Sequence, residues 1–562
     1  MKKTQDDEMK RDGLPVDEDP SMENRYSDEY DRDEDLDMEE EVLSEYAGDV
    51  PEEEPPSRKP KKKKSFFSRL FTDKNKNSQQ EPPLSHKEKN RYYVRVSYFI
   101  VAMFLSLCVY LVYFNVAERD AINSNSNNSK QDSNEDLVVR GSIYSTDGEL
   151  LAGTNVAEDG TETRVYPFSN VFAHVVGYST NGRSGAESVY NTELLTSHAS
   201  LFEQIQNESL DMKVRGDSLV LTLDSRIQQA CYNALGAYKG AIVVIEPSTG
   251  RILAMVSKPD FDPNSIDSDW EALNDATGDS PLYNRATQGL YPPGSTFKIL
   301  TTLAYLRQHN NQYEDFYFNC QGVVTQEDVS ITCYNGAVHG GQNLEQAFDN
   351  SCNGAFATIG LELDNKAFTE TCEDFLFNQS IPINMSSANS LFPLPEDASY
   401  GEEMTTAIGQ GNTVATPLQM AMVAATVANG GVMMTPYYVD RIETYDNETV
   451  EEYSPSVYKT VMTAEEAEIL GNFMESVVTN GTASALSGQL YTAAGKTGSA
   501  EYDSDGTGES LNTHSWFVGY SNVDNPDIAV AVIAEDGGSG SSTAVPIAKQ
   551  IFDTYYQYYS YD

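Results

Sequence analysis

The sequence predicts an α+β fold that follows one apolar segment long enough to cross a membrane. Runs rich in β-branched and apolar residues occur at 241–245 and 252–257, and again at 515–520 and 528–534. Helix-like patterns occupy the chain between these pairs, so one sheet should take strands from both ends of the domain. Residues 96–114 carry no charge over about 19 positions, which is the length that a helix needs to span a bilayer core.

Residues 1–95 are expected to form a disordered tail. Its acidic part, 1–56, has too few apolar residues to offset the chain entropy that folding removes. Its basic part, 57–95, mixes lysines and arginines with aromatic residues such as Phe66 and Phe71, which suits contact with anionic lipid headgroups. A flexible linker fits the same composition equally well, so both interpretations of the basic part stay open.

The apolar segment 96–114 should be an uncleaved signal anchor. Basic residues precede it, and Asn, Ser and acidic residues follow it, so the positive-inside rule places the N-terminus in the cytoplasm and the C-terminal bulk outside. The segment begins too far from residue 1 for a cleavable signal peptide. A buried core helix would have a polar face, and this segment has none. Residues 115–135, rich in Asn and Ser, should form a linker.

The remaining chain should contain two domains. Residues 136–213 predict a small pedestal domain, and residues 214–562 predict a larger one. The pedestal should have short strands at 137–139 and 164–166 and a helical stretch near 199–206. Besides the two strand pairs, the expected elements of the larger domain are a strand at 219–224, a helix at 225–237, a tight turn at 246–250 and a last helix at 544–556.

Composition excludes some classes of partner and cofactor. The chain has 86 acidic and 38 basic residues, a formal net charge of −48, so its outer part should repel anionic polymers and bind no nucleic acid. Cys320 and Cys333 lie in one polar region and could be bonded or free, and Cys352 should pack inward as a small apolar residue. The cysteine spacing is not a metal-ligand pattern and no histidine set is apparent near a cysteine pair, so we expect no metal and no cofactor.

Three short, widely spaced motifs carry the chemistry. They are Ser-x-x-Lys at 295–298, Ser-x-Asn at 351–353 and Lys-Thr-Gly at 496–498. Each is weak alone, and a second Ser-x-x-Lys occurs at 456–459, in a polar stretch with no apolar helix behind it. We interpret that copy as chance, because the copy at 295–298 follows two prolines and a glycine and opens an apolar helix pattern.

Ser295 and Lys298 should lie on one face of the first turn of that helix. A serine hydroxyl is a poor nucleophile until a base takes its proton, and a buried lysine near a second cation can lose its own proton near neutral pH. The spacing therefore predicts that the Lys298 amine reaches the Ser295 hydroxyl. The apolar stripe that faces the core should be Phe297, Leu300, Leu303 and Leu306.

Lys496 lies in a run of small residues that predicts a strand. A strand with such short side chains lets a substrate backbone lie against its edge, with main-chain hydrogen bonds supplying affinity. Lys496, Thr497 and Ser499 would then offer one cation and two hydroxyls to a substrate carboxylate, with Gly498 between them. A glycine-rich hairpin turn with an exposed lysine is the alternative for this motif alone.

These motifs and their surroundings resemble the class B penicillin-binding proteins. The resemblance extends to residues 140–148, 240–257, 259–264, 284–298, 339–340, 351–353, 409–411, 416–421 and 516–519. It covers roughly residues 136 to 555 and is closest to the short-pedestal penicillin-binding protein A group. One departure is Ser499, where many relatives carry threonine, and either residue keeps the hydroxyl.

The resemblance implies a penicillin-binding and serine β-lactamase-like fold, with a five-stranded antiparallel sheet flanked by helices. It implies a peptidoglycan D,D-transpeptidase that acts on stem peptides ending in D-Ala-D-Ala and is acylated by β-lactams. In this family Ser295 would be the nucleophile, Lys298 its base, and Ser351 a proton relay assisted by Lys496. Asn353 would hold the stem peptide, and the substrate carboxylate would lie against Thr497, Gly498 and Ser499.

The resemblance also implies a partner. The chain between the membrane segment and the larger domain is too short for a glycosyltransferase module, so a multi-span lipid-II polymerase should supply the glycan strands. Two other functions remain as alternatives, a non-enzymatic scaffold of a cell-wall growth complex and a β-lactamase-like hydrolase. The three intact motifs argue against the scaffold, and no acidic motif is assignable as the deacylating base that the hydrolase needs.

Overall fold

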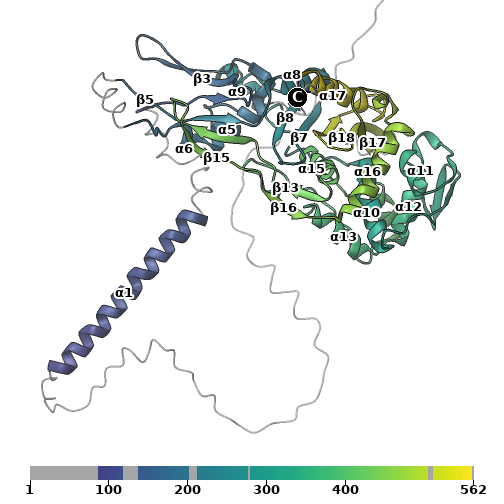
Figure 1. Ribbon diagram of the computed structural model, residues 1–562, viewed down its shortest axis with the longest axis horizontal. Helices are drawn as coiled ribbons and strands as arrows, with labels where there is room; N and C mark the ends of the chain where they lie inside the picture. The colour runs from purple at the N-terminus through teal and green to yellow at the C-terminus, as the bar shows by residue number, and fades with distance from the viewer. Residues whose placement is uncertain (1–85, 118–136, 201–211, 276–278, 504–510, 560–562) are drawn as a thin grey trace, which may run out of the picture. The chain divides into compact units, whose positions relative to one another are not determined.

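The computed structural model describes residues 86–117, 137–200, 212–275, 279–503 and 511–559 (Figure 1). The predicted acidic tail and most of the basic part, of the linker and of the predicted helix near 199–206 lie outside these residues. Helix α1 (His86–Ala117) contains an apolar stretch, Tyr93–Leu111, that is long enough to cross a membrane. The helix starts before the predicted membrane segment, so the expectation of a disordered tail is wrong for residues 86–95, whose basic and aromatic residues continue the helix.

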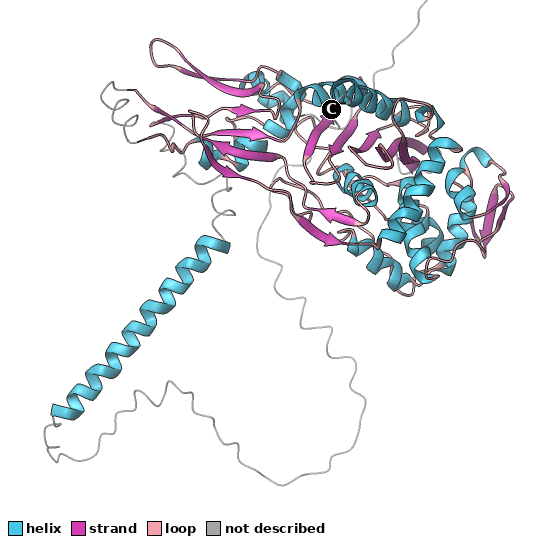
Figure 2. Cartoon of the chain, in the orientation of Figure 1, coloured by secondary structure: helices cyan, strands magenta, loops and turns pink. Residues whose placement is uncertain are grey.

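The larger domain is built on a five-stranded antiparallel sheet with the order β17-β18-β19-β7-β8. Figure 2 shows strands of the chain in magenta with helices in cyan around them. Its strands are β7 (Gly240–Ile245), β8 (Ile252–Lys258), β17 (Ala493–Asp503), β18 (Leu511–Ser521) and β19 (Ala529–Ala534). Strands from the beginning of the domain therefore pair with strands from its end, and β19 joins the two groups. The predicted α+β class and the five-stranded antiparallel sheet are confirmed.

Helices cover both faces of this sheet. Helices α8 (Ser225–Leu235) and α17 (Ala544–Tyr559) pack on each other and on one face (Figure 1). Helix α15 (Pro417–Ala428) packs across β7, β18 and β19, and α16 (Ala464–Thr479) packs against α15 and β17. Every residue of β7 and β19 is buried, as expected of strands with both faces covered. This covered sheet is the rigid frame on which β17 and its Lys-Thr-Gly motif are held.

A helical layer faces β17 and carries the other two motifs. It contains the 3₁₀ turn η4 (Gly294–Phe297), α10 (Lys298–Gln308), α11 (Leu344–Asp349), α12 (Asn353–Glu362), α13 (Asn365–Asp374) and α14 (Tyr400–Ala407). Two small two-stranded sheets lie beside α12. In one, β9 (Phe318–Cys320) pairs with β12 (Gly340–Gln342), and the other is a hairpin in which β10 (Val323–Gln326) pairs with β11 (Val329–Thr332).

The N-terminal part forms a second sheet with the order β15-β14-β6-β2-β3-β4. Its strands are β2 (Ile143–Tyr144), β3 (Leu150–Val156), β4 (Glu162–Val165), β6 (Ser218–Leu221), β14 (Val439–Glu443) and β15 (Thr449–Glu452). Two of the six strands thus come from the interior of the larger domain. The sheet also takes strands from both sides of residue 213, where the sequence suggests the end of the pedestal.

The other elements are short or peripheral. They are β1 (Val138–Val139) paired with β5 (Val214–Arg215), β13 (Val432–Met434) paired with β16 (Val457–Thr460), and the helical segments η2 (Ser169–Phe172), α4 (Ala173–Val176), α5 (Gly185–Val189), α6 (Asn191–Leu194), η3 (Pro263–Ser265), α9 (Ile266–Asn274), η5 (Tyr334–Gly336) and η6 (Ser484–Leu486). Beneath the pedestal strands, the buried carboxylate of Glu187 accepts ion-paired hydrogen bonds from Arg140 and Arg164 at 2.5 and 2.7 Å.

Candidate active site

Ser295 lies in the 3₁₀ turn η4, just before α10. Phe297, Leu300, Leu303 and Leu306 are all fully buried, which confirms the predicted apolar stripe and anchors the turn to the core. A second segment of the chain also holds the turn in place, because Gly294 N–H donates a hydrogen bond to the carbonyl of Gly409 at 2.9 Å. Ser295 is half-buried and opens into a cleft between the helical layer and β17.

Lys298 is completely buried, and its amine donates toward the second motif. Its Nζ lies 2.8 Å from the Ser351 carbonyl oxygen, 2.8 Å from Asn353 Oδ1 and 3.4 Å from Ser351 Oγ. Within the described part of the chain it makes no hydrogen bond with Ser295, which differs from the contact that the helical spacing predicts. The spacing gives a shared face, but the nearest strong acceptors belong to the 351–353 loop. Burial lowers the pKa of Lys298 to about 7.

Ser351 is the point where all three motifs meet. It sits between α11 and α12 with φ = 52°, a left-handed conformation that is uncommon for a residue other than glycine. Its Oγ accepts a hydrogen bond from Lys496 Nζ at 2.9 Å, in addition to its contacts with Lys298. Asn353, at the first turn of α12, donates from Nδ2 to the Thr332 carbonyl at 3.0 Å. The hydroxyl of Ser351 is therefore held between two amines.

Lys496 projects from β17 and is as fully buried as Lys298. Burial first, and then the proximity of Lys298, lower the pKa of Lys496 well below its usual value. The nearby carboxyl of Asp349 is also affected, because burial raises its pKa to about 6. Two amines on either side of one hydroxyl, with little compensating charge, favour the neutral form of at least one amine near pH 7. Such an amine can accept a proton.

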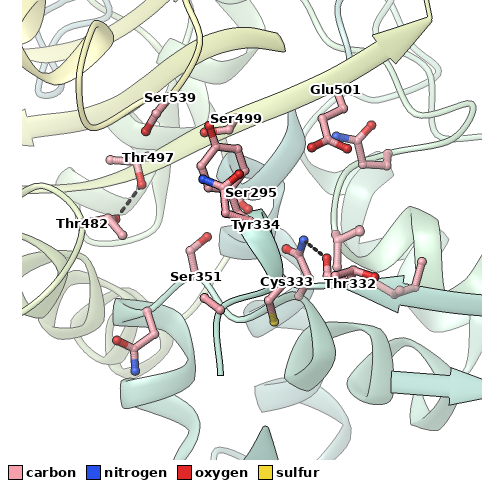
Figure 3. A pocket seen from close by; sticks show the side chains of 18 of the residues that line it. Ser295, Thr332, Cys333, Tyr334, Ser351, Thr482, Thr497, Ser499, Glu501 and Ser539 are labelled. Atoms are coloured by element: carbon pink, nitrogen blue, oxygen red, sulfur yellow. Dashed lines mark hydrogen bonds between the residues drawn. The ribbon is translucent and has the colours of Figure 1, made fainter. Parts of the chain in front are cut away.

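The cleft itself has a volume of about 740 Å³ and is lined by five of the eight predicted site residues (Figure 3). They are Ser295, Ser351, Asn353, Thr497 and Ser499. The other three, Lys298, Lys496 and Gly498, lie behind this lining and are buried. The structure thus brings all eight residues to one place, from three motifs that are far apart in the chain.

The wall formed by β17 is the edge of the sheet. β17 pairs with β18 on one side and is the last strand in the order, so its other edge faces the cleft. Thr497 and Ser499, two positions apart on the strand, both face the cleft. The Ser499 hydroxyl accepts from Gly540 N–H at 3.2 Å, and Thr497 is joined to Thr482 by a hydrogen bond of 2.6 Å between their hydroxyls (Figure 3).

Sequence reasoning did not find every residue at this site. Thr482 comes from the loop after α16 and adds a third hydroxyl beside Thr497, and no motif signals it. Glu501 also lines the cleft, two positions after Ser499 on β17. The chance copy of Ser-x-x-Lys lies elsewhere, since the Ser456 hydroxyl donates to Thr435 and Lys459 pairs with Asp374.

A cluster of three cysteines and one histidine lies directly behind Ser351. Cys320 Sγ is 3.7 Å from Cys333 Sγ and 3.4 Å from His339 Nδ1, and Cys333 Sγ is 3.8 Å from Cys352 Sγ. The expectation that no cysteine pair has a histidine nearby is wrong, because the turns between β9, β11 and β12 bring distant positions together. The three cysteines are free thiols in this structure, and Cys352 is buried as predicted.

Comparisons with known proteins agree with this geometry. Residues 240–553 match the penicillin binding protein transpeptidase domain, and residues 140–219 match the penicillin binding protein A dimerisation domain. The peptidoglycan D,D-transpeptidase PbpA of Mycolicibacterium smegmatis is 31% identical over 486 residues, which cover 81% of this chain and 96% of that protein.

Solved structures show the same likeness. A D,D-transpeptidase domain from Eggerthella lenta superimposes with a TM-score of 0.68 at 33% identity, covering 75% of this chain and 99% of that one. Penicillin-binding protein A from M. tuberculosis, solved as a ceftriaxone acyl-enzyme complex, gives a TM-score of 0.68 at 29% identity, again over 75% and 99% of the two chains.

Proposed function

Since this chain belongs to the penicillin-binding protein transpeptidase family, we propose that it is a peptidoglycan D,D-transpeptidase whose acyl-enzyme forms on Ser295. One observation supports the assignment above the others. The Ser351 hydroxyl is held between the buried amines of Lys298 and Lys496, in the cleft that Ser295 lines. A hydroxyl in that position can move a proton between two bases, and acyl transfer needs such a path.

In the acylation step the Ser295 hydroxyl oxygen attacks the carbonyl carbon of the penultimate D-Ala of a stem peptide. Its proton passes to the neutral amine of Lys298, directly or after a small movement of the side chain. The negative charge on the carbonyl oxygen is stabilised by the backbone N–H groups of Ser295 and Ser499. Losing one donor of such a pair costs about 2.7–4 kcal/mol of transition-state stabilisation.

In the second half of acylation the C–N bond to the terminal D-Ala breaks. The departing nitrogen takes a proton from the Ser351 hydroxyl, which regains one from Lys298 or Lys496 at 3.4 and 2.9 Å. An amine from a neighbouring stem peptide then attacks the ester on Ser295 and forms the cross-link. Water in place of the amine would give a carboxypeptidase.

The substrate would lie along the open edge of β17 as an added strand. Its terminal carboxylate would be held by the hydroxyls of Thr497 and Ser499. Gly498 between them lets β17 pack closely against Thr296 and Trp516. Thr482 would support Thr497 through their shared hydrogen bond. Asn353, fixed to the Thr332 carbonyl, would hold the amide of the stem peptide on the opposite wall.

The membrane helix suggests where this reaction takes place. Arg91 precedes the apolar stretch of α1, Arg95 lies near its beginning, and lysine-rich sequence lies upstream, so the N-terminus should be cytoplasmic and the catalytic domain extracellular. A transpeptidase there needs glycan strands, so we propose a multi-span lipid-II polymerase as partner. Recovery of such a polymerase after cross-linking in membranes, dependent on residues 138–221, is the measurement that checks this.

Labelling with a fluorescent penicillin tests the function. The full chain in detergent should form one covalent adduct, mapped by mass spectrometry to Ser295, with a lifetime of hours or longer. Ser295→Ala should lose the adduct, and Ser456→Ala, in the chance copy of the motif, should keep it.

Two outcomes would contradict the proposal. Rapid turnover of the penicillin would favour the hydrolase, for which the carboxylate of Glu501 in the cleft is the available base. A folded protein that forms no adduct would favour the scaffold.

A further inference from the structure

The cluster of three cysteines and one histidine behind Ser351 has the dimensions of a tetrahedral metal site. The ligand atoms of Cys320, Cys333, His339 and Cys352 all lie within 4.8 Å of one another. A tetrahedral Zn²⁺ with Zn–S bonds of about 2.3 Å and a Zn–N bond of about 2.0–2.1 Å separates two sulfurs by about 3.8 Å, and sulfur from nitrogen by about 3.6 Å. Three of the six separations between these atoms are close to these values, 3.7 and 3.8 Å between sulfurs and 3.4 Å between sulfur and nitrogen, and the other three are no longer than 4.8 Å.

The surroundings of the sulfurs fit thiolate ligands. Backbone N–H groups point at two of them, from Gly322 to Cys320 at 3.3 Å and from Ala355 to Cys352 at 3.4 Å. Groups that donate to ligand atoms in this way orient them and stabilise their negative charge. The three cysteines are buried and His339 is half-buried, so four ligand groups converge on a site largely closed to solvent.

Other interpretations account for only part of the cluster. A disulfide has an S–S bond of about 2.05 Å and uses two cysteines. Here Cys333 is nearly equidistant from Cys320 and Cys352, so no one pair is singled out. Simple apolar packing would explain buried thiols but not an imidazole nitrogen directed at one of them.

We propose that Cys320, Cys333, His339 and Cys352 bind one Zn²⁺ through three thiolates and the Nδ1 atom of the imidazole. Soft sulfur ligands and imidazole in a tetrahedron select zinc over magnesium or calcium. With all four positions filled by the protein, no site remains for water, so the ion is structural. It does not take part directly in the acyl transfer.

The ion would position the residues of the active site. Cys352 lies between Ser351 and Asn353 and caps the N-terminus of α12. Cys333 follows Thr332, whose carbonyl accepts the hydrogen bond from Asn353, and the cleft is lined by Thr332 and Cys333 on this side. One ion would therefore fix the hairpin β10–β11 to the loop that carries the Ser351 hydroxyl. This role rests on the proposed function, whereas the binding of zinc does not.

The first experiment measures zinc itself. The full chain, purified in detergent without chelator, should contain about one zinc per molecule by elemental mass spectrometry. Cobalt loaded in its place should show thiolate-to-metal charge-transfer absorption, which oxygen ligands do not give. Cys320→Ser and His339→Ala should lower the zinc content, and Cys372→Ser, at a buried cysteine outside the cluster, should leave it unchanged.

Three results would overturn the proposal. They are a folded wild-type chain that neither contains nor takes up zinc, a bond between Cys320 and Cys333 found by peptide mass mapping, and equal zinc loss in Cys372→Ser. None of these depends on whether Ser295 reacts with penicillin.

The second experiment addresses positioning. Zinc removal from the wild-type chain should slow penicillin acylation by about 10–100-fold. Losses of this size are typical when the groups that orient functional side chains are removed. Added Zn²⁺ should restore the rate. An unchanged rate in a zinc-free, folded chain would overturn the positioning role.

Discussion

At the scale of single residues, the chemistry depends on amines that are buried next to one another. Sequence spacing predicted that Lys298 would be paired with Ser295, whereas the structure has it donating to Ser351 and Asn353. The catalytic residues could be predicted from the motifs because few side-chain types can fill each chemical role. The acceptor of the Lys298 amine could not be predicted, because it is Ser351, which lies in a loop 53 positions away. The same holds for Cys320, Cys333 and His339, which meet only after the two small sheets have formed.

The pH dependence of acylation should follow Lys298. Its pKa is lowered to about 7 by burial, so the amine is protonated below that pH and neutral above it. Only the neutral amine accepts the proton of Ser295, so the second-order rate of acylation by penicillin should rise through pH 7 and level off above pH 8. Below pH 6 the rate should fall about tenfold per pH unit.

Lys298→Arg provides the control for this profile. A guanidinium stays protonated throughout the range, so acylation should be lost at every pH. A wild-type rate that is flat between pH 5.5 and 8.5 would exclude Lys298 as the base.

At the scale of elements, the 3₁₀ turn with Ser295 is held by close backbone contact with Gly409. A Cβ placed on Gly409 would lie 2.2 Å from the Gly294 carbonyl oxygen, closer than any stable contact. The sheet that faces this turn was predictable, because β7, β8 and β19 are continuous buried runs bounded by turns. The addition of β14 to the pedestal sheet was not, since β14 pairs with β6, and the paired residues Leu221 and Val439 lie more than 200 positions apart in the chain.

Gly409→Ala should therefore displace the turn and slow penicillin acylation by at least about tenfold. A tenfold loss corresponds to an increase of about 1.4 kcal/mol in the activation free energy. Gly430→Ala is the matched control. Gly430 also has a positive φ, 61° against 73°, so it carries the same backbone strain, but a Cβ there meets nothing within 4 Å. Equal acylation rates in the two variants, both folded by circular dichroism, would show that the contact with Gly294 is unimportant.

At the scale of the whole molecule, a strongly acidic chain is tied to the membrane by one helix. The formal net charge is −48, so the acidic surface should repel anionic polymers and attract cations. Composition alone predicted the apolar helix that the structure has, because a run of uncharged residues is read from the sequence without tertiary contacts. The side of the membrane on which each end lies should depend on the basic residues at and before the beginning of α1.

The proposed orientation can be measured in intact cells from which the wall has been removed. A tag after Asp562 should be digested by added protease, and a tag before Met1 should be protected until the membrane is permeabilised. Replacing Arg91 and Arg95 by Glu weakens the positive bias and should increase the fraction of inverted chains. Digestion of the N-terminal tag in the unaltered protein would reverse the assigned orientation.

The six-stranded sheet that joins β14 and β15 to the pedestal bears on how this protein can change over evolutionary time. Recombination that exchanged residues 138–221 alone would leave β14 facing a foreign β6, with mismatched side chains along the shared edge. A successful exchange between relatives must carry residues 439–452 as well, two segments separated by most of the catalytic chain. The pedestal and the enzyme should therefore be inherited together, and a tree drawn from either segment should have the same branching order.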